Sequence, residues 1–182
     1  MGEFSDAIKH VNIQSTRANH YIFNDIVKIA QNFGYVIDDV DLNKPWGFFV
    51  RFESTGAQQF IENFFPGLSY EDACLGNPDA QLSPKFLLVN PEGLLSWQYH
   101  ERRAERWAYL TDGSYYKSMT DEKGEPHKAK AGDVVQFECG ERHRLVGLDD
   151  EYVLVAEVWQ HADKHNLSDE SDIIRLEDIY KR

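Results

Sequence analysis

Four side chains that can bind a metal ion lie in two blocks between residues 93 and 143. Gln98, His100 and Glu105 belong to the first block, and His143 ends the second. Because residues two apart on a strand face the same side, Gln98 and His100 are expected to point into one cavity. Glu105 follows the bend of what reads as a β-hairpin and is expected to turn inward from the neighbouring strand. Imidazole and carboxylate groups suit zinc and other divalent first-row metals, so the pattern predicts a metal site.

Each of these residues also has a simpler interpretation. His100 and His143 are alternatively hydrogen-bonded core histidines. Glu105 is alternatively the partner of Arg102 or Arg103 across the hairpin. Gln98 is the weakest ligand chemically, because it offers a neutral amide oxygen, and it alternatively orients a water molecule.

The two blocks resemble the paired motifs of the cupin superfamily. The first block reads Leu95-Ser-Trp-Gln-Tyr-His-Glu-Arg-Arg-Ala-Glu-Arg-Trp107, and the second reads Gly132-(five residues)-Glu138-Cys-Gly140-Glu-Arg-His143. The first is similar to the type II mannose-6-phosphate isomerase block down to Arg-Ala-Glu-x-Trp, with Gln98 in the first histidine place. Further matches are Lys44-Pro-Trp-Gly47, Gly140 to Leu145, Glu157-Val158 and Asp172 to Tyr180. The resemblance implies an all-β, single-domain jelly-roll barrel (a double-stranded β-helix) and metal ligation by Gln98, His100, Glu105 and His143.

Glu157 is the candidate catalytic base. It lies in the apolar run Val-Leu-Val-Ala-Glu-Val-Trp159, where burial of a carboxylate is costly unless it is paired. Strand alternation places it on one face with Val153, Val155 and Trp159. A partly desolvated carboxylate has a raised pKa, which suits a general base. The alternative is a structural ion pair with an arginine of the barrel.

Three cationic residues are candidates for holding a phosphate or a negative oxygen. Lys85 matches a lysine of the resembled family, Arg175 lies in the matched C-terminal segment, and Arg102 follows His100. Solvated surface is the alternative for each of them. His127, His161 and His165 have no motif around them and are interpreted as surface residues.

The resemblance implies a metal-dependent aldose–ketose isomerase that acts on a sugar or sugar phosphate, similar to mannose-6-phosphate isomerase. Zinc is the expected metal, with iron, manganese or nickel as alternatives, and no organic cofactor is expected. An iron-dependent cupin dioxygenase and a non-catalytic sugar-binding cupin are the alternative functions.

Composition limits the partners and the location. The chain has 182 residues, 42% of them hydrophobic, which suits one globular domain. A formal net charge of −12 argues against nucleic-acid binding, and a phosphate site would need a local cluster of Arg and Lys. No apolar run approaches the ~18 residues of a membrane helix, and the N-terminus has no signal-peptide pattern. We expect a cytoplasmic protein without membrane partners, with Cys74 and Cys139 as free thiols.

The expected elements place the motifs in one cupin domain, residues 1–182. Residues 1–45 form an N-terminal helical extension, with a helix capped by Ser15 or Thr16 and ending at Gly34. A strand spans 46–53, residues 58–65 are a strand or a helix, and 66–84 are a long surface loop near the barrel mouth. Short apolar segments, among them a strand expected over 106–111, alternate with turns through the core barrel, about 81–160, followed by a tail over 161–182. A homodimer is expected, because the open sheet edges and the N-terminal helix need cover.

Overall fold

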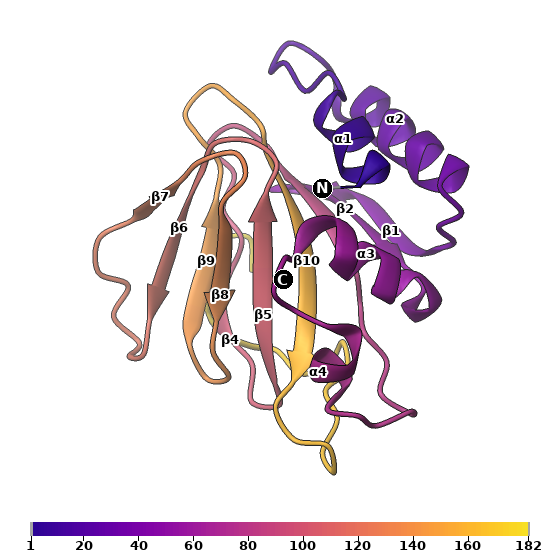
Figure 1. Cartoon of the computed structure of the whole chain (residues 1–182). Helices are drawn as coiled ribbons and strands as arrows, with labels where there is room; N and C mark the ends of the chain where they lie inside the picture. Colours follow the sequence, from indigo (N-terminus) through magenta and orange to yellow (C-terminus); the bar gives the residue numbers. More distant parts are fainter. Residues whose placement is uncertain (1, 182) are drawn as a thin grey trace.

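Two antiparallel sheets face each other, and helices cover the outer face of one of them (Figure 1). The computed structural model describes residues 2–181. The helices are α1 Glu3–Lys9, α2 Asn19–Asn32, α3 Ala57–Phe64 and α4 Tyr70–Cys74. The strands are β1 Ile37–Lys44, β2 Gly47–Phe52, β3 Lys85–Val89, β4 Trp97–Tyr99, β5 Arg103–Tyr109, β6 Gly113–Ser118, β7 His127–Ala129, β8 Val134–Phe137, β9 Arg142–Val146, β10 Val153–His161 and β11 Ile174–Glu177.

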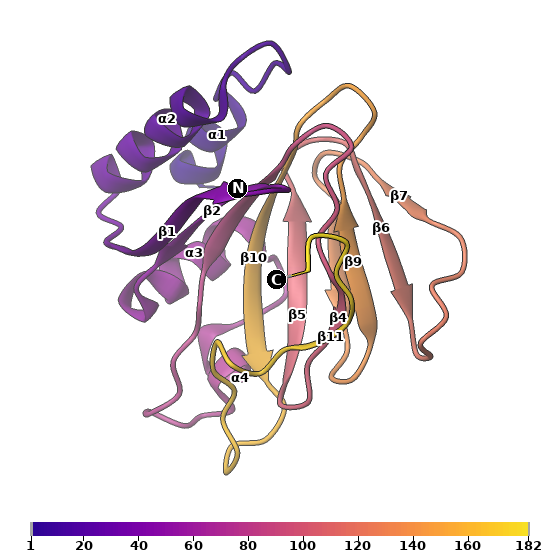
Figure 2. The same ribbon diagram turned by 180° about the vertical axis from the view of Figure 1, so that it is seen from behind.

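The strand order identifies the fold. The first sheet, sheet A, has the order β1-β2-β3-β10-β5-β8, and the second, sheet B, has the order β11-β4-β9-β6-β7. Within them, β3-β10-β5-β8 and β4-β9-β6-β7 are the two four-stranded sheets of an eight-stranded jelly roll, the architecture of cupins. The predicted all-β double-stranded β-helix is confirmed. Figure 2 shows the two sheets from behind, with β11 beside β4.

The predicted β-hairpin around the first block is wrong. β4 pairs with β9 and β11, whereas β5 pairs with β10 and β8, so the two strands belong to opposite sheets. In a jelly roll the chain crosses between sheets at this point. Residues at the end of β4 and on β5 therefore face each other across the barrel interior.

Two separate cores stabilise the fold. The outer core lies between the helices and sheet A, and aromatic rings such as Phe4, Phe60 and Phe86 pack there. The inner core lies between the sheets and includes Trp107 and Phe137, whose ring centroids are 4.4 Å apart. Strand β10 contributes to both cores: Val153 and Val155 belong to the inner core, and Leu154, Ala156 and Val158 belong to the outer core. The predicted alternation holds for these residues, but Trp159, predicted on the face of Val153 and Val155, belongs to the outer core. Burial on both faces explains the apolar run of β10.

The N-terminal extension contains more than one helix. Helix α1 and strand β1 were not predicted, and α2 begins at Asn19 after Ala18 rather than at a Ser15 or Thr16 cap. Helix α2 is followed by Gly34, whose φ of 84° suits glycine at the predicted stop. Strand β1 is an edge strand that pairs only with β2 among the described strands. Its polar sequence gave no strand signal.

Residues 57–82 pack against the outside of sheet A. Residues 57–64 are helix α3, which resolves the ambiguity between strand and helix. The predicted surface loop over 66–84 is wrong, because it contains α4 and buries Leu68, Ala73 and Leu82 in the outer core. Ser69 caps α4 by accepting a hydrogen bond from the amide of Asp72 at 3.0 Å. The segment thus contributes to the stability of sheet A.

The turn Lys44-Pro-Trp-Gly47 joins β1 to β2, the strand predicted over 46–53. Gly47 has φ 145°, and a Cβ there would lie 1.9 Å from the carbonyl oxygen of Leu88. Only glycine fits this close approach to β3. Within residues 2–181, no helix has the length and apolar content needed to cross a membrane.

Candidate metal centre

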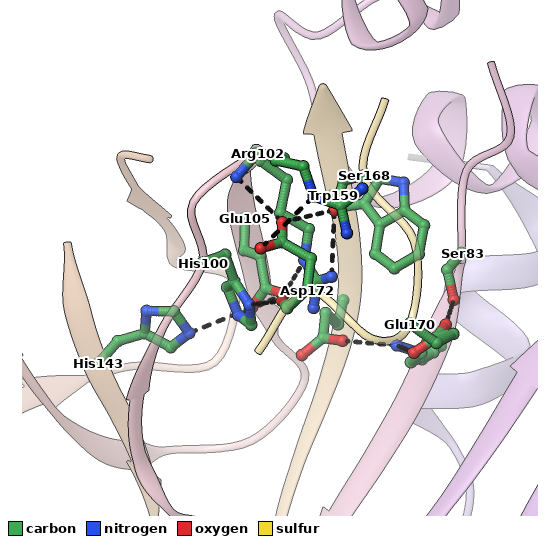
Figure 3. Close-up of polar contacts among 12 residues, drawn as sticks. Ser83, His100, Arg102, Glu105, His143, Trp159, Ser168, Glu170 and Asp172 are labelled. Atoms are coloured by element: carbon green, nitrogen blue, oxygen red, sulfur yellow. Dashed lines mark hydrogen bonds and ion pairs between the residues drawn. The ribbon is translucent and has the colours of Figure 1, made fainter. Parts of the chain in front are cut away.

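His100, Glu105 and His143 meet inside the barrel (Figure 3). His100 directly follows β4, Glu105 comes from β5 and His143 from β9, and all three are buried. One potential ligand atom from each lies within 4.8 Å of the others. His100 Nε2 is 3.0 Å from Glu105 Oε1, and His143 Nε2 is 3.3 Å from Glu105 Oε2. The two sequence blocks therefore converge as predicted.

Backbone carbonyls orient both imidazole rings. His100 Nδ1 lies 2.5 Å from the carbonyl oxygen of Asp172, and His143 Nδ1 lies 2.9 Å from that of Glu141. Because a carbonyl oxygen only accepts, each Nδ1 carries a proton and donates it. In the neutral form of each ring, Nε2 then carries a lone pair that is directed at Glu105. Burial lowers the pKa of His100 despite the opposing charge of Glu105, which favours this neutral form.

The unsatisfied atoms of the cluster fit a divalent cation. Within residues 2–181, His100 Nε2, His143 Nε2 and Glu105 Oε2 are buried and have no hydrogen-bond partner. Acceptors that face one another without a donor are costly in a buried site. A cation between them would satisfy all three, and imidazole and carboxylate are ligands of zinc, manganese and iron.

Glu105 supplies the negative charge of the cluster. Burial raises its pKa, but the contacts with His100, Arg103 and His143 lower it by more, so the pKa lies well below its usual range. Arg103 Nε donates to Glu105 Oε1 at 2.9 Å. Glu105 thus also forms the ion pair with Arg103 that was its alternative interpretation, while its Oε2 remains directed at His143. A divalent ion bound by this set would keep a net positive charge.

Gln98 lies beside the cluster in sheet B. It is the register partner of His143 on β9 and of Arg175 on β11. Its amide oxygen accepts a hydrogen bond from Ser96 Oγ at 2.5 Å. The role of Gln98 as a fourth ligand therefore stays a prediction.

A cavity of about 180 Å³ adjoins the cluster and contains most of the predicted site residues. Its lining includes Lys85, Gln98, Glu105, Glu157 and Arg175 from the prediction, together with Trp46, Arg103 and Glu170. Arg102 is not among the lining residues. Its guanidinium binds the carbonyl oxygen of Leu167 at 2.6 Å and the carboxylate of Asp169 at 3.1 Å. Arg102 thus binds the C-terminal segment and does not face the cavity.

Arg103 is the cationic residue that sequence reasoning missed. It shares the inward face of β5 with Glu105, two positions along the strand, and lies with its guanidinium carbon 4.4 Å from the ring centre of Trp159. The signal was the same spacing that identified Gln98 and His100. The apolar pattern predicts a strand that begins only at Arg106, which leaves Arg103 outside the alternation.

Glu157 lies in the cavity and is also ion-paired. Its carboxylate accepts a hydrogen bond from Trp107 Nε1 at 3.0 Å and lies 3.5 Å from Lys85 Nζ. Burial and the charge of Glu105 raise the pKa of Glu157 to about 7, although Lys85 and Arg103 oppose the shift. Its ion-pair partner is a lysine rather than the arginine considered from sequence. The cavity position and the ion pair coexist.

Carboxylates already pair with three of the cations around this cavity, Lys85, Arg51 and Arg103. Lys85 Nζ lies 3.0 Å from Glu170, and Arg51 Nη1 lies 3.1 Å from the same carboxylate. Glu170 also accepts a hydrogen bond from Ser83 Oγ at 2.5 Å. Arg103 is engaged by Glu105. The cluster of cations that a phosphate site needs is present, but protein carboxylates occupy it.

The prediction for His161 is wrong, because this residue is buried at the end of β10. Its Nε2 donates to the carbonyl oxygen of Gln81 at 2.9 Å, and its Nδ1 accepts from the amide of Ser168 at 3.0 Å. His161 therefore links two loops. His127 and His165 are exposed, as predicted. Cys74 and Cys139 are free thiols, also as predicted.

Comparisons with solved structures return jelly-roll proteins. Oxalate decarboxylase of Bacillus subtilis, a protein described with Mn(II) centres, aligns with 15% identity and a TM-score of 0.49 over 74% of this chain. A double-stranded β-helix protein of Klebsiella pneumoniae aligns with 14% identity and a TM-score of 0.43, over 53% of this chain and 76% of its own. Hazelnut vicilin aligns with 9% identity and a TM-score of 0.47, over 68% of this chain and 32% of its own.

The chain spans only 29% of the length of the oxalate decarboxylase chain. No protein-family model and no curated protein matches the sequence. At these identities and TM-scores the likenesses say nothing about activity, and the fold assignment rests on the strand order.

Proposed function

We propose that this protein is a metal-dependent aldose–ketose isomerase that acts on a free sugar. The observation that supports the proposal is one cavity lined both by Glu105, from the buried His100–Glu105–His143 cluster, and by Glu157, a carboxylate with a pKa of about 7. A metal site and a base poised near neutral pH are the two groups that this reaction needs. The similarity of the first block to mannose-6-phosphate isomerases agrees with this reaction type.

Each residue has a defined role in the proposed reaction. His100, Glu105 and His143 would hold a divalent ion, with zinc expected and manganese, iron or nickel as alternatives. Such an ion would polarise a sugar oxygen and so acidify the neighbouring C–H bond. Ionised Glu157 takes the proton from C2 of the aldose, which leaves an enediolate. The hydroxyl proton on O2 passes to O1, and Glu157 returns its proton to C1, which yields the ketose. Trp107 and Lys85 hold the Glu157 carboxylate in place through the contacts described above.

The charge pairing favours an unphosphorylated sugar. A phosphate entering the cavity would have to displace Glu170 from Lys85 and Arg51, or Glu105 from Arg103. Displacing Glu105 would leave a buried carboxylate without its partner, which is costly. Displacing Glu170, whose side chain is 42% exposed, costs less but still exchanges existing ion pairs. A neutral sugar needs no such exchange.

The proposal is tested by metal analysis together with an isomerisation screen of free and phosphorylated aldoses and ketoses. Interconversion of a free aldose and ketose by metal-loaded protein, lost on chelation, is the expected result. Oxygen consumption by the iron-loaded protein would instead support the dioxygenase alternative. Sugar binding without turnover for any metal tested would support the non-catalytic alternative.

A further inference from the structure

The segment between β10 and β11, residues 162–173, contacts the metal centre through Asp172 (Figure 3). The backbone carbonyl of Asp172 accepts the Nδ1 proton of His100 at 2.5 Å. The carboxylate of the same residue accepts the amide of Glu101 at 2.9 Å on one oxygen and the amide of Arg102 at 3.0 Å on the other. One residue thus binds both the ring of His100 and the two backbone amides that follow it.

These contacts depend on one another. The carbonyl of Asp172 stays at His100 only if the tail backbone keeps its position relative to the bend at 100–102. The carboxylate bonds to the two amides fix that position, and Ser168 Oγ donates to Asp172 Oδ2 at 2.7 Å. Asp172 is buried, with 6% of its surface exposed, so water cannot readily replace these hydrogen bonds when they are lost.

The rest of the segment is anchored to sheet A. The amide of Ser168 donates to His161 Nδ1 at the end of β10, at 3.0 Å. Arg103 Nη1, from the start of β5, donates to the carbonyl oxygen of Asp169 at 2.8 Å. Sheet A therefore holds the segment in register, and the segment in turn reaches His100 at the end of β4 in sheet B.

We propose that Asp172 is a positioning residue of the metal centre: its carboxylate clamps the bend after His100, and its carbonyl fixes the tautomer and orientation of the His100 ring. Partners of this kind hold a ligand's lone pair towards the metal, and their loss weakens metal binding by roughly 10- to 100-fold. The inference rests on the metal site of the proposed function but not on the reaction or its substrate.

The test compares Asp172→Ala and Asp172→Asn with a control, Asp169→Ala, in the full-length protein. Asp169 lies in the same segment, and its exposed carboxylate binds Arg102 and Ser171 without touching His100. The measurements are the Zn²⁺ dissociation constant by competition with a chelator, the visible absorption spectrum of the Co²⁺-loaded protein, and the melting temperature of the metal-free protein.

We expect Asp172→Ala to weaken Zn²⁺ binding by about 10- to 100-fold and to change the Co²⁺ spectrum. Asp172→Asn keeps one acceptor oxygen and should fall between Asp172→Ala and wild type. Asp169→Ala should keep the wild-type affinity and spectrum. If Asp172→Ala does not fold, the intermediate affinity of Asp172→Asn decides.

Wild-type affinity and spectrum in the folded Asp172 variants, with only a lower melting temperature, would overturn the proposal and leave Asp172 a structural residue. Equal losses in Asp169→Ala would also overturn it. Failure of the wild-type protein to bind Zn²⁺ or Co²⁺ would instead contradict the metal centre itself.

Discussion

Glu157 on β10 and Lys85 on β3 are cross-strand register partners, and their charged groups lie 3.5 Å apart inside the cavity. The pairing of two neighbouring strands therefore sets the position of the proposed base and of the cation that opposes its raised pKa. Trp107, the register partner of Glu157 on the other side, donates to the same carboxylate. Three adjacent strands, β3, β10 and β5, therefore position the Glu157 carboxylate.

Replacing Glu157 with glutamine should abolish most of the turnover while keeping the fold. The amide cannot accept a proton from the sugar, but its oxygen can still accept from Trp107. We expect kcat to fall by roughly two to four orders of magnitude, with wild-type metal content. Steady-state kinetics and metal analysis check this. An unchanged kcat in the stable, metal-loaded variant would remove Glu157 from the mechanism.

The same substitution should change how stability depends on pH. The pKa of Glu157 is about 7 in the folded protein, against the ordinary value of 4.5. Between these values the native state binds more protons than the unfolded state, so this residue makes stability fall as the pH rises. Lys85 and Arg103 oppose the pKa shift, and Glu105 and Glu170 add to it.

We therefore expect metal-free wild type to lose stability relative to Glu157→Gln from about pH 4.5 to about pH 7. Thermal unfolding of both proteins across this range measures the difference. Parallel stability profiles would show that Glu157 does not titrate in this window.

Removing His143 should remove the metal. His143→Ala deletes one of the three unsatisfied acceptors that face one another. We expect less than one bound metal ion per chain and loss of turnover. The control is His127→Ala, which changes an exposed histidine outside the cluster. Full metal content in a folded His143→Ala protein is the outcome that excludes His143 as a ligand.

Glu170 should control the preference between free and phosphorylated sugars. Glu170→Gln removes the carboxylate that pairs with both Lys85 and Arg51. These cations keep their contacts with Glu157 and Asp38 and can then pair with a phosphate. We expect affinity for a sugar phosphate to rise by about tenfold relative to the free sugar, or about 1.4 kcal/mol. The matched control is Asp38→Asn, which removes the same charge from Arg51 but not from Lys85. Equal gains in both variants would indicate a general charge effect.

Trp46 should contribute a hydrogen bond to the sugar. It lines the cavity, and its Nε1 is buried without a hydrogen-bond partner among the described residues. Trp46→Phe keeps an aromatic ring and removes only that donor. We expect weaker sugar binding by several fold and an unchanged or higher melting temperature, because no internal hydrogen bond is lost.

The control for Trp46 is Trp97→Phe. Trp97 Nε1 donates to the carbonyl oxygen of Asp121 at 2.9 Å, and Trp97 does not line the cavity. Loss of this hydrogen bond in Trp97→Phe should lower the free energy of unfolding by about 1 kcal/mol and leave sugar affinity unchanged. Titration calorimetry and thermal unfolding distinguish the two variants. Equal affinity of Trp46→Phe and wild type would exclude the contact.

Spacing along the chain was enough to find the metal cluster and the inward face of β10. His100 and Glu105 were recognised from one motif, and Glu157 from its place in an apolar strand. The hairpin error arose because an apolar segment does not encode which sheet the next strand joins. In a jelly roll that choice depends on long-range pairing, here of β4 with β9.

Three further errors have separate causes. Strand β1 is polar and half exposed at an edge, so it lacks the alternation that identifies a strand. Strand β5 begins three residues before its predicted start, so the pattern does not identify Arg103 as a cavity residue, and Arg102 is predicted in its place. His161 is held in a buried position by hydrogen bonds to Gln81, which is distant in sequence, and to Ser168, which follows a turn. No sequence motif predicts either partner.

The separation of the two cores has an evolutionary consequence. Because the aromatic packing on the outer face of sheet A is independent of the cavity, the chain can accumulate substitutions among its inward-facing polar residues without losing the packing that keeps it folded. The specificity proposed for the cavity can therefore change through mutation, or be selected in the laboratory, while the outer core keeps the protein folded.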